Sequence, residues 1–230
     1  MAPQPDTSPY DFQENNPVAR VTPTAPTPAK KRTLVPLVLV FLCTLAPIVV
    51  AFVLYNNPQW WPDQSSNYGT LVDPQRPMPP SEELQLTTLD GQPFDLQSLK
   101  GKWLLLSAGE AACPESCARK LFITRNSHAS QGKNVDRLAR IWLITDDGEV
   151  PAKVLEAYQG TVMVRARPEQ LARFLLARDT VAAPPGQPGL LDPIWIIDPL
   201  GNLMLQFPAN ADGVEVRQDI TRLVYNSRIG

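Results

Sequence analysis

The chain carries two cysteines four residues apart, in the pentapeptide Cys113-Pro114-Glu115-Ser116-Cys117, and these thiols are its clearest candidates for chemistry. Cys113 suits the N-cap of a helix with Pro114 at the first helical position, where a missing N–H costs nothing. Cysteines four apart at a helix start lie on the same face, one turn apart. Two such thiols can bind a soft metal, exchange a disulfide, or do both.

The acidity of these thiols is set by opposing charges. A helix N-terminus favours a thiolate, and Arg119 and Lys120 add to that effect from a turn further on. Glu110 and Glu115 bracket Cys113 and oppose it. We therefore expect a nucleophile of moderate acidity. An inert disulfide or vestigial thiols are the alternative interpretations, although a bridge across so short a loop restrains the unfolded chain little.

The rest of the composition excludes several function classes. His128 is the single histidine, so His-dependent nucleophile schemes and the usual zinc ligand sets are not expected. The formal net charge of -2 offers no basic footprint for nucleic acid. The acidic run 146–149 lacks the ligand spacing of a calcium loop and is interpreted as a plain strand-to-helix loop.

Residues 34–54 contain no charged side chain and are long enough to cross a bilayer. Lys30, Lys31 and Arg32 precede this segment, and no Lys or Arg follows until Arg76. The positive-inside rule therefore predicts a single-pass anchor with a cytoplasmic N-terminus. A cleaved signal peptide fits poorly, because the apolar stretch is too long and begins too far from Met1.

Four segments follow from this anchor. We predict a disordered cytoplasmic tail at 1–33, a transmembrane helix at 34–54, a periplasmic stalk at 55–82 and one globular domain at 83–230. The tail and the stalk are both rich in proline and polar residues. The location predicted is a bacterial inner membrane, with the C-terminal domain in the periplasm. Cys43 lies inside the span and is interpreted as a packing residue.

The pattern predicts an N-terminal hairpin, then alternating strands and helices, then a second hairpin and a last helix. Apolar runs, turn dipeptides and prolines at helix starts define these segments. A thioredoxin-like α/β fold, with a mixed central sheet flanked by helices and an N-terminal β-hairpin, has this order. The expected strands are 84–87, 94–96, 103–107, 141–145, 161–165, 193–197 and 202–207, and the expected helices are 113–128, 151–158, 168–177 and 214–225.

These residues resemble the SCO/SenC family. The resemblance rests on Gly101-Lys102-Trp103-Leu104-Leu105-Leu106-Ser107, on the Cys113-Pro114-x-x-Cys117 spacing and on Trp195-Ile196-Ile197-Asp198-Pro199-x-Gly201. Members of that family are membrane-tethered thioredoxin-like proteins that help to mature the copper centres of cytochrome c oxidase. The resemblance thus implies Cu(I) at Cys113 and Cys117.

The chain departs from the family at one copper ligand. The resemblance places a ligand histidine near Leu190, and the sequence there has none. His128 is about 22 Å from Cys113 along the expected helix, too far to join the same ion. A third ligand would have to be a methionine. Met78 lies on the predicted stalk and could reach an ion bound by the two cysteines. For Met204 and Met163 the sequence indicates no position close to that ion.

Three functions remain open at this stage. The first is an SCO-like assembly factor that acts through the dithiol as a Cu(I) carrier or as a thiol reductant, with a respiratory oxidase subunit as its partner. The second is a general periplasmic thiol-disulfide oxidoreductase, in which Cys113 attacks and Cys117 resolves. The third is a chemically inactive scaffold that binds an oxidase subunit. Pro193 is near the place of the cis-proline of thioredoxin-like folds, and its isomer is left open.

Overall fold

The computed structural model describes residues 34–57, 60 and 67–229, and the chain divides into two units, Met1–Pro62 and Asp63–Gly230. In the first unit, helix α1 (Val35–Asn56) carries exposed apolar side chains along its length. It is long and apolar enough to cross a membrane, as some signal sequences are. The predicted tail lies outside the described residues, as does most of 58–66.

The second unit is built on an eight-stranded mixed sheet with the order β1-β8-β7-β4-β5-β6-β2-β3. The three strands β4, β5 and β6 are parallel, and the remaining pairs are antiparallel. All seven residues of β4 are buried, as expected of a parallel strand covered on both faces. The strands are β1 (Thr70–Pro77), β2 (Leu86–Thr88), β3 (Pro93–Phe94), β4 (Trp103–Gly109), β5 (Leu138–Ile144), β6 (Val162–Ala166), β7 (Ile194–Ile197) and β8 (Asn202–Phe207).

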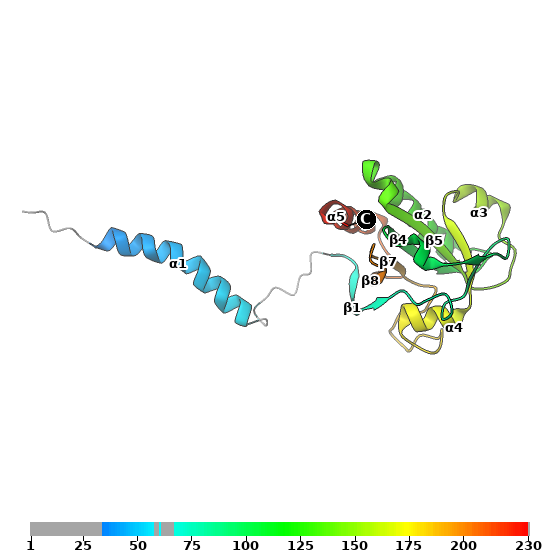
Figure 1. Cartoon of the computed structure of the whole chain (residues 1–230), viewed down its shortest axis with the longest axis horizontal. Helices are drawn as coiled ribbons and strands as arrows, with labels where there is room; N and C mark the ends of the chain where they lie inside the picture. Colours follow the sequence, from blue (N-terminus) through cyan, green and yellow to red (C-terminus); the bar gives the residue numbers. More distant parts are fainter. Residues whose placement is uncertain (1–33, 58–59, 61–66, 230) are drawn as a thin grey trace, which may run out of the picture. The chain divides into compact units, whose positions relative to one another are not determined.

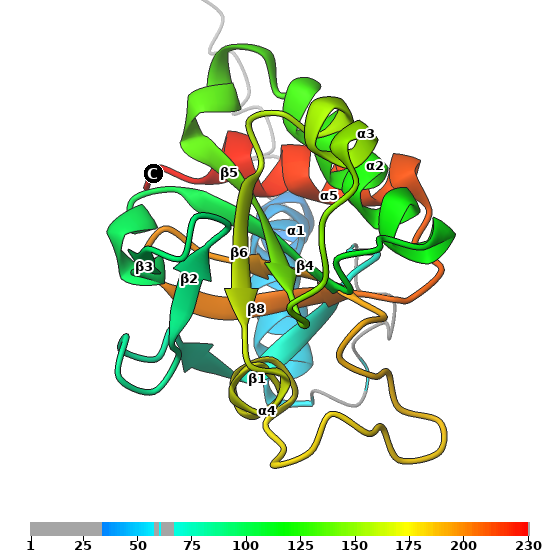
Figure 2. The same cartoon turned by 90° about the vertical axis from the view of Figure 1, so that its right-hand side faces the viewer.

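Helices cover both faces of this sheet (Figures 1 and 2). Helices α2 (Glu115–Ala129), α3 (Ala152–Ala157) and α5 (Gly213–Asn226) pack on one face, where they bury side chains such as Leu105 and Trp142. Helix α4 (Pro168–Leu171) continues into a π-helical turn, η4 (Ala172–Leu176), on the opposite face. The 3-10 segments are η2 (Leu96–Leu99) and η3 (Gly132–Arg137). This arrangement confirms the predicted thioredoxin-like fold class.

Strand β1 corrects the predicted stalk. Residues 70–77 pair with β8 at the edge of the sheet, and Met78 is buried in the main core. Prolines made this segment resemble a linker, but an edge strand tolerates proline because its outward N–H groups need no partner. The cis peptide bond of the described residues precedes Pro74 and not Pro193. The folded unit therefore begins before residue 83.

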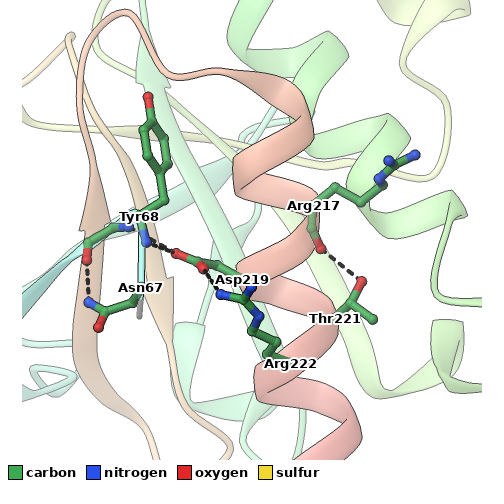
Figure 3. A network of polar contacts seen from close by, with 7 residues as sticks. Asn67, Tyr68, Arg217, Asp219, Thr221 and Arg222 are labelled. Carbon is green, nitrogen blue, oxygen red and sulfur yellow. Dashed lines mark hydrogen bonds and ion pairs between the residues drawn. The ribbon is translucent and has the colours of Figure 1, made fainter. Parts of the chain in front are cut away.

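A buried carboxylate ties the start of this unit to its last helix (Figure 3). Asp219 on α5 is 3% exposed and accepts hydrogen bonds from the backbone N–H groups of Tyr68 (2.7 Å) and Gly69 (2.9 Å). Arg222, one turn further along α5, lies 3.6 Å from the same carboxylate. The segment that leads into β1 is thus held against α5 by a charge that is itself paired.

Candidate functional site

The two cysteines lie where the chain leaves the central strand and enters α2. Strand β4 ends at Gly109, and Pro114, rather than Cys113, is the N-cap residue of α2. Cys113 has a φ of 44°, in the left-handed region that costs a non-glycine residue about 1–3 kcal/mol. The predicted N-cap is therefore wrong by one residue: Pro114 adopts the extended geometry of the cap, while Cys113 closes a turn through its N–H to Glu110 O (2.9 Å).

Cys113 and Cys117 form a disulfide, with their Cα atoms 5.1 Å apart. Both residues are buried, Cys113 with 8% and Cys117 with 3% of its surface exposed. The cluster around them is apolar and comes from the 110–113 loop, α2, β5 and the start of α3. The two thiols that the sequence singled out are brought together here, and Cys113 is the more accessible of the two. The cluster also contains Ala111, Leu121, Trp142, Ile144 and Val150.

Asp146 holds the loop that carries Cys113, a role that the sequence did not indicate. Its carboxylate oxygens each lie 3.2 Å from the N–H of Ala111, and one accepts a further bond from Gly148 N–H (2.9 Å). Arg165 on β6 donates to the backbone carbonyls of Asp146 (2.6 Å) and Gly148 (2.9 Å). The 146–149 run is thus more than a plain connection, because it fixes the position of the cysteine loop.

Lys120 points into the protein instead of into solvent. It is 5% exposed, and its ammonium donates to Ala108 O at the end of β4 (2.7 Å) and to Leu191 O in the loop before β7. Burial lowers the pKa of Lys120 from its ordinary 10.5 to about 8, and the nearby Asp192 carboxylate opposes that shift. The sequence predicted a distant contribution from this charge, whereas the structure makes it a buried link between α2, β4 and the 189–192 loop.

Trp142 lies beside Cys117, over a glycine. A Cβ placed on Gly109 would be 3.1 Å from Cys117 Sγ and 3.1 Å from Trp142 Nε1. The indole N–H of Trp142 is fully buried and has no hydrogen-bond partner in the described part of the chain. Leaving such a donor unpaired costs about 1–3 kcal/mol. Ser107 of β4 is the register partner of Trp142 on β5, and its buried hydroxyl likewise has no hydrogen-bond partner among the described residues.

The possible third copper ligands are placed elsewhere. His128 is near the C-terminal end of α2, and its pKa is lowered by burial and, secondly, by the charge of Arg140. Leu190 is buried in the core on the opposite face of the sheet, together with Met78, which is therefore not free to reach the cysteines. Met163 does pack against the cysteine cluster, contrary to the prediction, but Trp142 of β5 lies between it and β4.

A cleft of about 470 Å³ lies beside the cysteine loop. Glu110, Asp146 and residues 189–192 are among the residues that line it. Gly189, from the proline-rich loop before β7, is among its lining residues, while neither cysteine is. Among the described residues, no three His, Cys, Asp or Glu side chains are grouped to hold a metal ion. The site is therefore a disulfide in an apolar setting with a cleft next to it.

A family model described as "Transmembrane-like, thioredoxin-like, C-terminal domain" matches residues 103–227, more than half of the chain. The chain belongs to this family. The match to this transmembrane-like, thioredoxin-like family runs from the first residue of β4 to the residue after α5, and so includes both cysteines. No curated protein matches the chain.

Solved structures share the fold at low sequence identity. Copper-bound ScoI from Arabidopsis thaliana is 14% identical, with 70% of this chain and 99% of that chain covered and a TM-score of 0.49. Copper-bound ScoI from Bradyrhizobium japonicum is 21% identical (60% and 96% covered, TM-score 0.42). A thiol:disulfide interchange protein from Bacteroides sp. is 17% identical (67% and 91% covered, TM-score 0.48). At these identities and TM-scores the three similarities say nothing about activity.

Proposed function

We propose that this protein is a membrane-anchored, SCO-like assembly factor for cytochrome c oxidase that acts as a thiol reductant through Cys113 and Cys117. The observation that carries this proposal is the disulfide between these two cysteines, which lies at the connection between β4 and α2. The disulfide at this junction joins the 110–113 loop to α2 within a buried cluster. The chemistry needs no group beyond the two sulfurs and a partner disulfide.

The reaction proceeds in two exchanges. In the reduced protein, the Cys113 thiolate attacks one sulfur of a partner disulfide, forms a mixed disulfide and releases the first partner thiolate. Cys117 then attacks the Cys113 sulfur, which closes the bond seen here and releases the second partner thiol. Two electrons and two protons pass to the partner, and a thiol reductant must restore the dithiol afterwards. Cys113 is assigned the attacking role because it is the more exposed of the pair.

Cu(I) delivery is the second candidate, with the ion as cargo. Two converging thiolates suit Cu(I), which accepts soft ligands. The same donor set is poor for Cu(II), which favours nitrogen and oxygen. Leu190, at the place where the resemblance predicts a histidine, is buried in the core, so the proposed site has two sulfur ligands.

The proposed location is a bacterial inner membrane. Helix α1 is the anchor, and Lys30, Lys31 and Arg32 before it favour a cytoplasmic N-terminus and a periplasmic domain. An oxidising compartment of this kind allows disulfides to form. The proposed partner is an oxidase subunit that exposes a pair of copper-ligand thiols in their oxidised form.

Covalent trapping tests the proposed function. In a Cys117→Ser strain the resolving thiol is absent, so the mixed disulfide between Cys113 and its partner accumulates and can be identified by mass spectrometry. The proposal predicts an oxidase subunit as the main adduct. A broad mixture of periplasmic proteins would instead support a general thiol-disulfide oxidoreductase. Absence of any adduct, together with normal oxidase assembly, would leave only a scaffold role.

A further inference from the structure

We propose that the indole N–H of Trp142 is a positioning donor for the Cys117 sulfur, and that it forms its hydrogen bond when the disulfide is reduced. This inference rests on the proposed thiol-disulfide function. It adds a residue outside the Cys113–Cys117 motif that sets how readily the disulfide accepts electrons.

The geometry over Gly109 brings the two atoms together. Cys117 Sγ and Trp142 Nε1 are each 3.1 Å from the point where a side chain on Gly109 would begin. Both atoms would therefore contact a side chain at position 109, and Cys117 and Trp142 belong to the same buried cluster. The absence of a Cβ at Gly109 is what leaves this space to the sulfur and the indole.

The donor is unused in the oxidised state. Trp142 is fully buried, and its Nε1 has no partner in the part of the chain that the structure describes. The other buried members of its cluster are Ala111, Leu121, Ile144 and Val150, whose side chains accept no hydrogen bond, and partly buried residues that include Tyr158 and Met163 pack against them. A buried donor without a partner calls for an explanation, and reduction supplies one. A disulfide sulfur is a weak acceptor, whereas a thiolate accepts a charge-assisted bond.

Reduction of the Cys113–Cys117 bond by a small dithiol transfers two electrons; Cys113 takes up one proton, Cys117 is left as the thiolate that accepts the indole hydrogen bond, and the second proton of the dithiol goes to solvent. A hydrogen bond that exists only in the reduced form shifts this equilibrium toward the dithiol. The charged groups near the cysteines are the same in the oxidised and reduced protein, and a substitution of Trp142 removes none of them. They are the Glu110 and Glu115 carboxylates, the Lys120 ammonium, the Asp146 carboxylate and the Arg165 guanidinium.

The test is the redox equilibrium of the full-length protein in detergent, measured against dithiothreitol. Trp142→Phe keeps an aromatic side chain, although a smaller one, and removes the donor; it is expected to shift the equilibrium about three- to tenfold toward the disulfide. Trp195→Phe is the matched control: Trp195 is also fully buried with an unpartnered indole N–H, but it packs in the core on the opposite face of the sheet. The control is expected to leave the equilibrium unchanged.

Two further measurements separate a hydrogen bond from a packing effect. Reduction of the wild-type protein should move the Trp142 indole N–H resonance downfield and leave that of Trp195 in place. Gly109→Ala keeps the donor but adds a methyl group whose carbon would lie 3.1 Å from both atoms, so one of them must shift. It should move the equilibrium in the same direction as Trp142→Phe. An unmoved Trp142 resonance, or equal potentials in the wild type and both tryptophan variants, would overturn the inference. Because the reductant is a small dithiol, these outcomes are independent of the cellular role, which the trapping experiment tests.

Discussion

The ammonium of Lys120 on α2 lies 2.7 Å from the carbonyl oxygen of Ala108, at the end of the central strand. This contact joins the helix that carries Cys117 to the strand that leads to Cys113. The same ammonium reaches Leu191 O, so it also fixes a loop that lines the cleft. A buried charge therefore links α2, the end of β4 and the 189–192 loop.

The stability contributed by Lys120 should depend on pH. Its pKa is about 8 in the folded protein and 10.5 when the chain is unfolded, so the unfolded state binds the extra proton between these values. Stability therefore rises with pH in this window. We expect the oxidised wild type to gain up to about 3 kcal/mol relative to Lys120→Met between pH 8 and 10.5.

Chemical denaturation of both proteins across that range measures this difference. Subtracting the Lys120→Met values from the wild-type values cancels the titration of all other groups. Because both proteins are oxidised, Cys113 and Cys117 do not titrate. If the difference in free energy of unfolding between the two proteins stayed constant from pH 7 to 10.5, burial would not lower the pKa of Lys120.

The edge strand β1 should be required for a stable soluble domain. A fragment from Glu83 lacks β1, buried Met78 and the N–H donors to Asp219, so its free energy of unfolding should be lower by about 3 kcal/mol or more than that of a fragment from Asp63. Denaturation curves of the two fragments check this. In the longer fragment, Met78→Ala should cost about 2–5 kcal/mol, and Leu71→Ala, at an exposed position of β1, less than about 0.5 kcal/mol. Equal stability of the two fragments would show that β1 is dispensable.

Loss of the Asp146 carboxylate should loosen the cysteine loop. In Asp146→Ala, the amide hydrogens of Ala111 and Gly148 lose their acceptor and should exchange with solvent about tenfold faster or more. Hydrogen-exchange mass spectrometry or NMR measures the change. Asp147→Ala, at the exposed neighbouring position, is the control and should exchange as the wild type does. Unchanged exchange at Ala111 in Asp146→Ala would remove the positioning role from this carboxylate.

The Cu(I) candidate predicts a simple stoichiometry. Titration of the reduced fragment from Asp63 against a competing chromophoric chelator should give one bound equivalent, lost in Cys113→Ser and in Cys117→Ser. Met163→Leu should bind as the wild type does, because Trp142 separates Met163 from β4. If the wild type retains no Cu(I) at chelator-buffered concentrations, copper delivery by this domain alone is excluded and the thiol-reductant role stands by itself.

Local sequence signals predicted most of the sheet and helices. The buried strands β4, β5 and β7 contain the apolar runs 103–106, 141–144 and 194–197, and the turns at Gly91 and Gly201 adopt the positive φ that glycine allows. β1 was missed because an edge strand bears prolines and exposed polar residues, as a linker does.

The two cysteines were found from their spacing, but the groups that position them were not. The burial of Lys120 depends on unpaired carbonyls that only the tertiary structure brings to it. The place of Trp142 beside Cys117 depends on the register of β5 against β4 and on the space over Gly109. Neither relationship has a periodic or local signature in the sequence.

The central claim is that the sulfur chemistry of Cys113 serves oxidase assembly. The most direct measurement is cytochrome c oxidase activity in membranes of a Cys113→Ser strain, with Cys43→Ser as the control for the cysteine outside the site. We predict that Cys113→Ser reduces assembled oxidase to the level of a deletion strain, while Cys43→Ser leaves it at the wild-type level. Normal oxidase activity in the Cys113→Ser strain would contradict the account and leave the domain as a scaffold.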